Sequence, residues 1–491
     1  MTGLLREILM ARIMGAGLYT DIYAVALKLP SFFRRFFAEG ALSAVLVPHF
    51  ARIMEKEKPE DVLRFTRQML SFLAAGLLAF VLLFEMGMPL VLRFMVKGWV
   101  VADPTSLSKV VHFSRVMFPY IWLISLVAYM SSVLNALHRF AWTAAISIVV
   151  NVSMILSLLV SAWLGPRISA EGVLHSVMIC SLVGGVLQCL ILWLHCRRHG
   201  MPLRFQRPRW TSEIGGILKA AIPGFFGAGV TQINVFVDMW FASYLPKGSI
   251  SYLNYADRLN QFPISLLGAA LGTALLPTLS GLWGDGQRDK ALQTQERAFM
   301  MGASLTIPAA LGLFLLAGPI VSAVYGGGKF DHFAAIQTTG ALKAFVCGLP
   351  FYVLGKVFSS AFFAHKDTTT PMLVTFVAVT LNAVLNALLI DSFAHRGIAA
   401  ATATSAAVNS LLLVFILVRK KWFTLSLPAF ISLGQIAIAG GLMSLGVVMA
   451  KGWLLAGGES LWGTLACVAV GVAIYFGAFW AFRLHKRLKW A

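Results

Sequence analysis

The chain has 491 residues, of which 58% are apolar and only 12% are charged. Soluble domains carry about 25% charged residues, so these charges are too few to give a chain of this length a soluble surface. The mean hydropathy of +0.80 agrees. The net charge of +20 does not predict nucleic-acid binding, because no basic domain stands apart from the apolar segments.

The apolar runs are continuous rather than alternating, which predicts membrane-spanning helices and excludes an outer-membrane barrel. We expect about fourteen spans. In chain order they lie near residues 3–16, 22–50, 69–94, 112–136, 141–164, 173–195, 214–243, 250–283, 298–324, 338–363, 371–391, 397–418, 429–450 and 461–482.

Loop charges predict the orientation of these spans. Basic residues gather on alternate loops, as at 52–67 and 197–209, whereas the opposite side holds scattered charges such as Lys97 and Lys247. Because cytoplasmic loops are rich in Lys and Arg, the basic side is predicted to be cytoplasmic. Both termini then lie in the cytoplasm, which requires an even number of spans.

Two sequence matches indicate an internal repeat. SSVLNALHRF at Ser131 resembles SSAFFAHKDT at Ser359, and EGALSAVLVPHF around Pro48 resembles GAALGTALLPTL around Pro277. The offsets of the two matches agree to within a single residue, and both shift the chain by six spans. Because six is even, the halves are parallel repeats. The sequence therefore predicts an all-α polytopic membrane protein. We assign residues 1–200 to one six-helix lobe, 210–424 to a second, and 425–491 to two further C-terminal helices.

Arginines inside the predicted spans are the main candidates for function. A charged side chain in lipid is costly and normally faces a cavity or a partner. The repeat places Arg34 and Arg258 on matching helices of the two halves, and Arg6 lies on the first span. Guanidinium groups suit phosphate oxygens, so we expect an anion site that receives a lipid pyrophosphate. The alternative is an interfacial helix whose arginines extend toward the headgroups.

A second set of residues could bind a cation. Asp238 is a lone carboxylate in an apolar segment, which binds a cation or is protonated. Asn382 and Asn386 share a helix face and, with Thr402, offer hard oxygen ligands that suit Na⁺. The alternative is ordinary hydrogen bonding between helices. We expect no cofactor other than Na⁺ as a coupling ion.

The sequence carries no sign of an enzyme. The segment YGGGKF at 325–330 lacks the spacing and the Ser or Thr of a phosphate-binding loop, and neither HExxH nor GxSxG is present. The five cysteines form no CxxC pair, which argues against a zinc site. We therefore expect a transporter.

Three segments resemble the MurJ (MviN) family, the lipid II flippases of bacterial cell-wall synthesis. They are ARIMGAGLYTDIYAVALKLPSFFRRFFAEGALSAVLVPHF, YLNYADRLNQFPISLLGAALGTALLPTLS and LNAVLNALLI with HRGIAAATATSAAVNSLLL. The resemblance covers nearly the whole chain. It implies two six-helix lobes plus two helices that form a lipid-tail groove, in a monomer of the bacterial cytoplasmic (inner) membrane. The implied partners are membrane lipids and lipid II, an undecaprenyl-pyrophosphate disaccharide-pentapeptide, which is moved to the outer leaflet by alternating access.

The resemblance also assigns roles to residues. Six residues of this chain match residues that line the substrate-binding cavity of the family: Arg6, Arg34, Arg258, Glu7, Asp21 and Ser251. Five residues match a sodium site of the family: Asp238, Asn382, Asn386, Thr402 and Ile398, the last through its carbonyl group. Family members carry a further N-terminal stretch with another cavity arginine, so we expect the natural start to lie upstream of Met1.

The sequence leaves two other functions to compare with the flippase. A cation-coupled exporter of drugs or polysaccharides, from the same superfamily, needs acids more than arginines in order to attract cationic substrates. A membrane-embedded glycosyltransferase or polymerase needs a catalytic carboxylate in a large extracytoplasmic loop, and the outer loops here are short. The excess of arginine within the spans favours the flippase.

Overall fold

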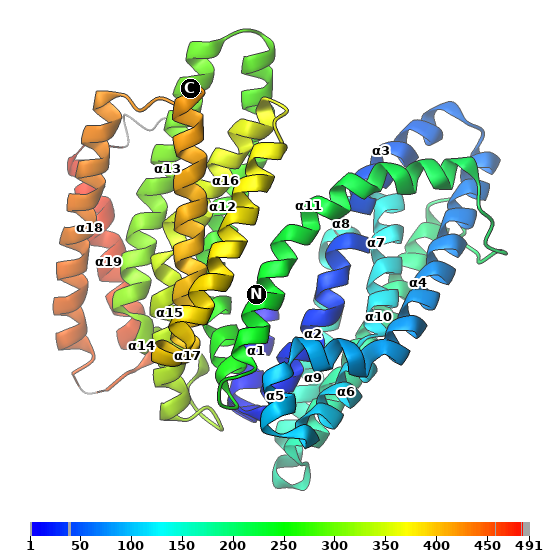
Figure 1. The fold of residues 1–491 in the computed structure, drawn as a ribbon, viewed down its shortest axis with the longest axis horizontal. Coiled ribbons are helices and arrows are strands. Elements are labelled where there is room, and N and C mark those ends of the chain that lie inside the picture. Colours follow the sequence, from blue (N-terminus) through cyan, green and yellow to red (C-terminus); the bar gives the residue numbers. More distant parts are fainter. Residues whose placement is uncertain (1, 38–40, 457, 483, 485–491) are drawn as a thin grey trace. The chain divides into compact units, whose positions relative to one another are not determined.

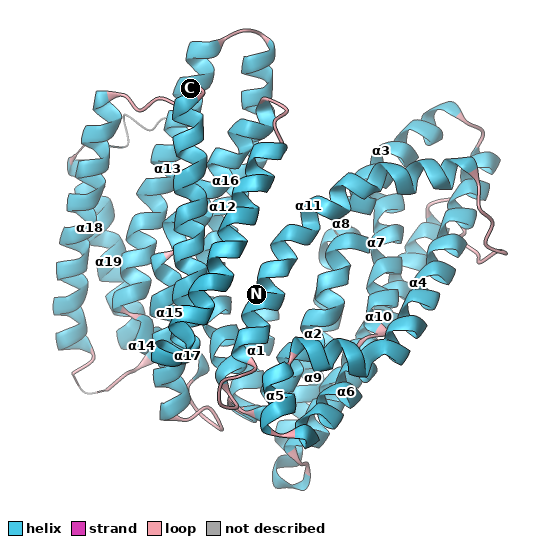
Figure 2. Cartoon of the chain, viewed as in Figure 1, coloured by secondary structure: helices cyan, strands magenta, loops and turns pink. Residues whose placement is uncertain are grey.

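The computed structural model describes residues 2–37, 41–456, 458–482 and 484 (Figure 1). The side chains of residues 35–37, 41–44, 104, 223–231 and 269–274 are outside this description. Within the described residues the chain is helical, with no strand beyond an isolated bridge between Gly327 and Phe330 (Figure 2). The predicted all-α fold is confirmed.

The chain divides into two compact units, Met1–Ser251 and Tyr252–Ala491. The first unit contains α1 (Thr2–Met14), α2 (Leu18–Phe37), α3 (Ala41–Lys56), α4 (Pro59–Met95), α5 (Lys97–Ala102), α6 (Pro104–Met117), α7 (Tyr120–Ala136), α8 (Phe140–Ala145), α9 (Ser147–Leu164), α10 (Ala170–Arg198) and α11 (Ser212–Ala242). A helix that begins at the end of this unit, α12 (Ser249–Gly284), continues into the second. The second unit also contains α13 (Arg288–Leu315), α14 (Ala317–Tyr325), α15 (His332–Cys347), α16 (Leu349–Ala364), α17 (Thr369–Arg419), α18 (Leu427–Leu454) and α19 (Leu461–Ala481).

The contact-based division differs from the repeat-based one. Helix α11 packs against α2, α3 and α4, so it belongs to the first unit although it follows the basic link at 197–209. The predicted lobes, residues 1–200 and 210–424, are drawn from the sequence repeat and not from contacts. This division into lobes stays a prediction.

Nine helical segments of the described chain are long and apolar enough to cross a membrane. Several predicted spans consist of two helices each. The span at 112–136 is interrupted at Phe118 and Pro119, where proline cannot donate a backbone hydrogen bond. The spans at 141–164, 298–324 and 338–363 are likewise α8 with α9, α13 with α14 and α15 with α16.

The beginning of the chain also differs in detail from the predicted spans. The span at 22–50 corresponds to α2 and α3, and residues 38–40 between them lie outside the described residues. The first span corresponds to α1, whose 13 residues rise about 20 Å, which is less than the bilayer core of about 30 Å.

The backbone repeats at the offset found in the sequence. Helix α17 consists of two arms joined at Ala394, which has φ 49° and ψ −134°. Gly165, the matching position of the first half, ends α9 with φ 55° and ψ −128°. His138 and Lys366, which the same offset relates, have φ values of 58° and 62°. These matched turns confirm that the backbone repeats between the two halves.

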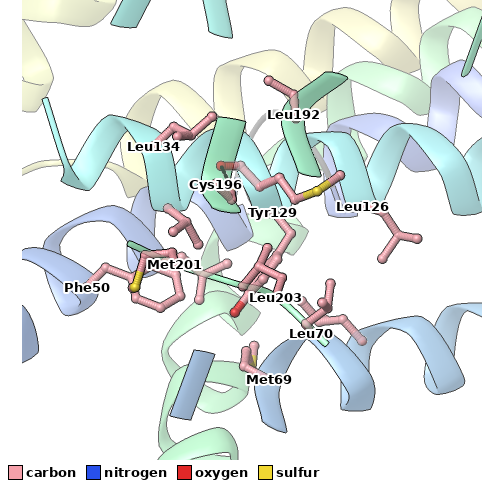
Figure 3. Close-up of a cluster of buried hydrophobic side chains, with 14 of the residues drawn as sticks. Phe50, Met69, Leu70, Leu126, Tyr129, Leu134, Leu192, Cys196, Met201 and Leu203 are labelled. Carbon is pink, nitrogen blue, oxygen red and sulfur yellow. Dashed lines mark hydrogen bonds between the residues drawn. The ribbon is translucent and has the colours of Figure 1, made fainter. Parts of the chain in front are cut away.

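A cluster of buried side chains holds the first unit together (Figure 3). Tyr129 of α7 packs among Phe50 of α3, Met69 of α4 and Leu192 of α10. Its hydroxyl group donates to the carbonyl oxygen of Thr66 at 2.7 Å. Because an apolar interior offers no water to a hydroxyl group, this bond is needed for Tyr129 to be buried there.

The two C-terminal helices pack onto the second unit. Helix α18 lies against α13 and α19, and α19 also contacts α14 (Figure 1). Tyr475 of α19 donates to the carbonyl oxygen of Ser304 at 2.5 Å, which fixes α19 against α13. The predicted lipid-tail groove would be formed by these helices.

The matched turns lead to a reciprocal prediction. Alanine at 394 has a positive φ that costs an L residue about 1–2 kcal/mol, so Ala394→Gly should raise the unfolding temperature in detergent. Gly165→Ala should lower the unfolding temperature, because the backbone of the new alanine would be held at the same unfavourable positive φ. Gly76→Ala on α4 is the control, since a side chain there meets open space. Shifts of the same sign for the two turn variants would contradict the equivalence of the turns.

Candidate functional site

Asp21 and Ser251, both predicted site residues, are in direct contact. The Asp21 carboxylate accepts hydrogen bonds from the backbone N–H groups of Gly248 (2.6 Å) and Ser251 (2.7 Å) and from the Ser251 hydroxyl group (2.5 Å). The side chains of both predicted residues are buried. The first N–H groups of a helix have no partner within the helix, so Asp21 of α2 caps the start of α12. We call these contacts the Asp21 junction.

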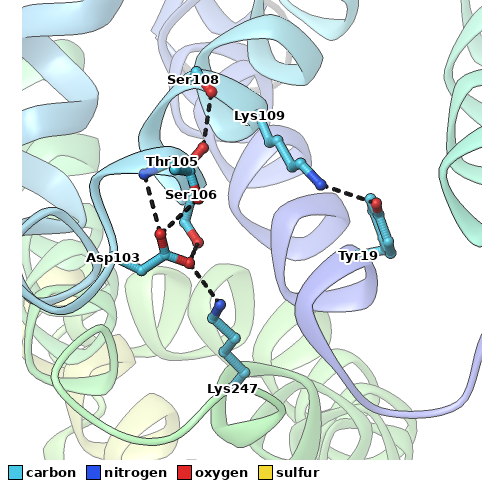
Figure 4. Close-up of polar contacts among 7 residues, drawn as sticks. All are labelled: Tyr19, Asp103, Thr105, Ser106, Ser108, Lys109 and Lys247. Atoms are coloured by element: carbon cyan, nitrogen blue, oxygen red, sulfur yellow. Dashed lines mark hydrogen bonds and ion pairs between the residues drawn. The ribbon is translucent and has the colours of Figure 1, made fainter.

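The loop before α12 has two further contacts with the first unit. Lys247 forms an ion pair of 2.9 Å with Asp103 at the start of α6 (Figure 4). Hydrogen bonds from Thr105, Lys247 and other neighbours hold the pKa of Asp103 well below its usual range, so this carboxylate stays charged. The backbone N–H of Gly98 donates to the Ser243 hydroxyl group at 3.0 Å, and a Cβ atom at Gly98 would collide with the Ser243 backbone.

Tyr19 links three helices at the same end of the first unit. Its hydroxyl group donates to Glu171 of α10 at 2.8 Å. The same hydroxyl group accepts from Lys109 of α6 at 3.2 Å (Figure 4). Together with the Asp21 junction, these bonds tie the starts of α2, α10 and α12 to α6. This end carries Lys109 and also Lys247, one of the scattered charges that predict the outer side.

Arg6 and Glu7 form an ion pair that also contacts α9. The Nη2 atom of Arg6 lies 2.5 Å from Glu7 Oε1, and its Nη1 atom donates to Asn151 Oδ1 at 3.1 Å. The Glu7 side chain is 2% exposed and that of Arg6 14%. An anion that binds Arg6 therefore meets a cation whose charge is already partly balanced by Glu7.

The two other predicted arginines lie in different units. Arg34 follows Asp21 on α2, about 20 Å along the helix. Arg258 is exposed on α12 within the second unit, next to the buried Leu259. Their convergence on one cavity stays a prediction.

Four of the five predicted sodium ligands come together in the second unit. The two arms of α17 run antiparallel on either side of the turn at Ala394. Asn382 of the first arm donates to Thr402 Oγ1 of the second at 3.3 Å. Asn386 donates to Asn382 Oδ1 at 3.0 Å, and Thr402 donates to the carbonyl oxygen of Ile398 at 3.0 Å. The oxygen atoms thus form a compact chain with both asparagines fully buried. Asp238 belongs to the first unit, where Asn234 donates to it at 3.3 Å.

Two features were not foreseen from the sequence. Lys356 lies within the span His332–Ala364, and the rule that identified the arginines would have found it. A cavity of about 420 Å³ lies between α3 and α11, with Arg52, Glu57 and Glu213 on its wall. The cavity brings together residues far apart in the sequence, so hydropathy could not have shown it.

The model of the family described as "Lipid II flippase MurJ" matches residues 10–462. A probable lipid II flippase MurJ of Rhizobium tropici is 34% identical over 96% of this chain and 90% of its own. The lipid II flippase MurJ of Burkholderia cenocepacia is 30% identical over 98% of this chain and 94% of its own.

Solved structures agree with these relatives. A lipid II flippase MurJ in an inward closed conformation has a TM-score of 0.83 and 25% identity, covering 99% of this chain and 97% of its own. An inward-facing MATE family multidrug transporter of the MOP superfamily has a TM-score of 0.68 at 14% identity, covering 86% of this chain and 94% of its own. The MATE likeness shows a shared fold alone. With a family match over most of its length, the chain belongs to the MurJ family of lipid II flippases, which are transporters and not enzymes.

Proposed function

We propose that the chain moves lipid II from the inner to the outer leaflet by alternating access, and that Arg6, Arg34 and Arg258 receive its pyrophosphate. The observation that carries the proposal is the presence of arginines within apolar helices of both units, Arg34 on α2 and Arg258 on α12. In lipid such charges require a polar cargo or partner. Pyrophosphate oxygens match the guanidinium fork, and the polyprenyl tail stays in the bilayer.

The membrane potential favours the return of the empty carrier. An empty site with net positive charge is drawn toward the negative interior, by about 2.3 kcal/mol per charge for each 100 mV. Bound pyrophosphate cancels this charge, so the loaded carrier moves outward with less opposition. We also propose that both chain ends lie in the cytoplasm and that the protein acts as a monomer in the inner membrane.

The Asp21 junction is proposed as the closure on the outer side. It connects α2 to the start of α12 through one carboxylate and three donors. Hydrogen bonds of this kind can be exchanged for water when the outer side opens, at a modest cost per bond. Glu7 is proposed to position the Arg6 guanidinium, since it pairs with Arg6.

Na⁺ is proposed as a coupling ion at the oxygen cluster of α17. The donor set fits, because Asn382, Asn386, Thr402 and the Ile398 carbonyl group place four oxygen-bearing groups within one hydrogen-bonded chain. Asp238 would supply the negative charge. Na⁺ would hold the two arms of α17 together and so make their packing dependent on the ion.

The arginine site is tested by growth. In a strain depleted of its own flippase, Arg34→Ala and Arg258→Ala should each abolish growth support, because the cargo loses a charge-assisted contact. Arg204→Ala, in the exposed link after α10, removes the same charge and should support growth. Normal growth with both helix variants, at equal protein levels in the membrane, would refute the arginine site.

The Asp21 junction is tested by accessibility. Loss of a capping carboxylate costs about 0.5–2 kcal/mol, so Asp21→Ala should increase the labelling rate of the Ser249→Cys variant by about 2- to 30-fold. An impermeant thiol reagent is added outside the cell, and Asp103→Ala, which removes the exposed pair with Lys247, serves as the comparison. An unchanged labelling rate in Asp21→Ala would show that the junction does not close this side.

The sodium site is tested by thermal unfolding of the purified protein. Na⁺ but not K⁺ should raise the unfolding temperature, and Thr402→Val, which keeps the side-chain shape but removes Oγ1, should abolish the rise. Thr380→Val is the matched control, since its exposed hydroxyl group bonds only within the first arm of α17. The proposal fails when Na⁺ and K⁺ act alike on the unmodified protein, or when Thr402→Val responds to Na⁺ as fully as Thr380→Val.

A further inference from the structure

Lys356 is a cation in the middle of an apolar helix. It lies on α16 within the span His332–Ala364, eight residues before the helix ends. Eight residues correspond to about 12 Å of helix, which is farther than a lysine side chain reaches. A lysine near a helix terminus can extend its ammonium group into the headgroup region. Lys356 is too far from the end of α16 to do so there.

The ammonium group of Lys356 lies against α12. A Cβ atom at Gly268 would be 3.0 Å from Lys356 Nζ, so the missing side chain of Gly268 provides the space that the ammonium group occupies. Val353, Val357 and Phe358 point instead into the core of the second unit. Among the described residues, Lys356 Nζ has no hydrogen bond and no ion pair. The lysine is an exposed residue, and its charge lies on the α12 side of α16.

The internal repeat shows that the fold does not require this lysine. Ser360 donates to the carbonyl oxygen of Lys356 at 3.0 Å, and Ser132, its match in the first half, donates to that of Ala128 at 2.9 Å. The two helices therefore share their local geometry, with alanine in the first half where the second has lysine. Because alanine satisfies the same backbone, the cost of a charge in the membrane points to a ligand.

Lys356 and Arg258 are arranged in series along α12. Gly268 follows Arg258 by ten residues, about 15 Å along the helix. Helix α12 begins near Lys247 on the predicted outer side, so Lys356 lies on the cytoplasmic side of Arg258. A pyrophosphate group is shorter than this rise along α12, so we expect it to meet the two cations one after the other.

We propose that Lys356 forms a separate anion-binding position, which receives the pyrophosphate of the lipid-linked substrate before it reaches Arg258. This inference rests on the proposed function. A lysine ammonium group is a point charge on a flexible stem, whereas arginine offers a rigid fork of donors. The lysine therefore suits a first, orientation-tolerant contact with phosphate oxygens, and the arginine suits the more specific contact that follows.

Binding of defined lipids to the full-length protein tests the inference. Undecaprenyl pyrophosphate, undecaprenyl phosphate and phosphatidylglycerol are titrated in turn and bound lipid is measured by native mass spectrometry. Lys356→Gln should weaken binding of undecaprenyl pyrophosphate about tenfold or more, as expected for the loss of a charged contact. Lys356→Arg should retain most of the affinity. Lys343→Gln on the neighbouring α15, where the ammonium group lies over the Phe314 ring, should bind as the unmodified protein does.

The outcomes separate this inference from the proposed function. Equal binding by Lys356→Gln and the unmodified protein would overturn the Lys356 position and leave the flippase proposal standing. An equal loss of phosphatidylglycerol binding would also overturn it, since the lysine would then hold ordinary phospholipid headgroups. Failure of the unmodified protein to prefer undecaprenyl pyrophosphate over phosphatidylglycerol would count against the proposed function itself. Because the repeat has alanine at the equivalent position, we expect Lys356→Gln to fold.

Discussion

A polar group inside a bilayer has to find its partner within the protein, because lipid tails offer none. This constraint explains the polar contacts of the chain. The Tyr129 hydroxyl group bonds a backbone carbonyl oxygen, the Asp21 carboxylate bonds the unpaired N–H groups of a helix start, and Arg6 bonds Glu7. Each bond connects or positions helices, so the same interactions that make burial possible also set the geometry of the candidate site.

The internal repeat separates what the fold needs from what the function needs. Asp103 and Asp331, at matching positions of the two halves, both cap the start of a helix, and Gly165 and Ala394 both form the same sharp turn. Such shared features are requirements of the architecture. Differences between the halves are more informative about transport, because the helix geometry around them is the same. The replacement of Ala128 by Lys356 is such a difference.

The sequence predicted the helices and the repeat because both leave local signals, a continuous apolar run and a constant offset. It did not predict the break at Pro119, since hydropathy does not register a lost hydrogen bond. It grouped Asp21 and Ser251 only through a family resemblance, because 230 residues separate them and no local pattern links a carboxylate to a distant helix start. Arg34 and Arg258 were matched by the repeat, which gives the helix but not the direction of the side chain.

A carrier of an anionic lipid has to bind its cargo and then release it, so the strength of each contact is limited. A single deep site that satisfied every pyrophosphate oxygen would trap the lipid inside the membrane. Cations placed in series avoid this, because each new contact compensates for the one being lost. Because Arg6 is already paired with Glu7, an anion at Arg6 would be held more weakly than at an unpaired arginine. Lys356, with its flexible stem, forms contacts that tolerate a moving ligand. Partial pairing and flexible cations are therefore properties that transport itself requires.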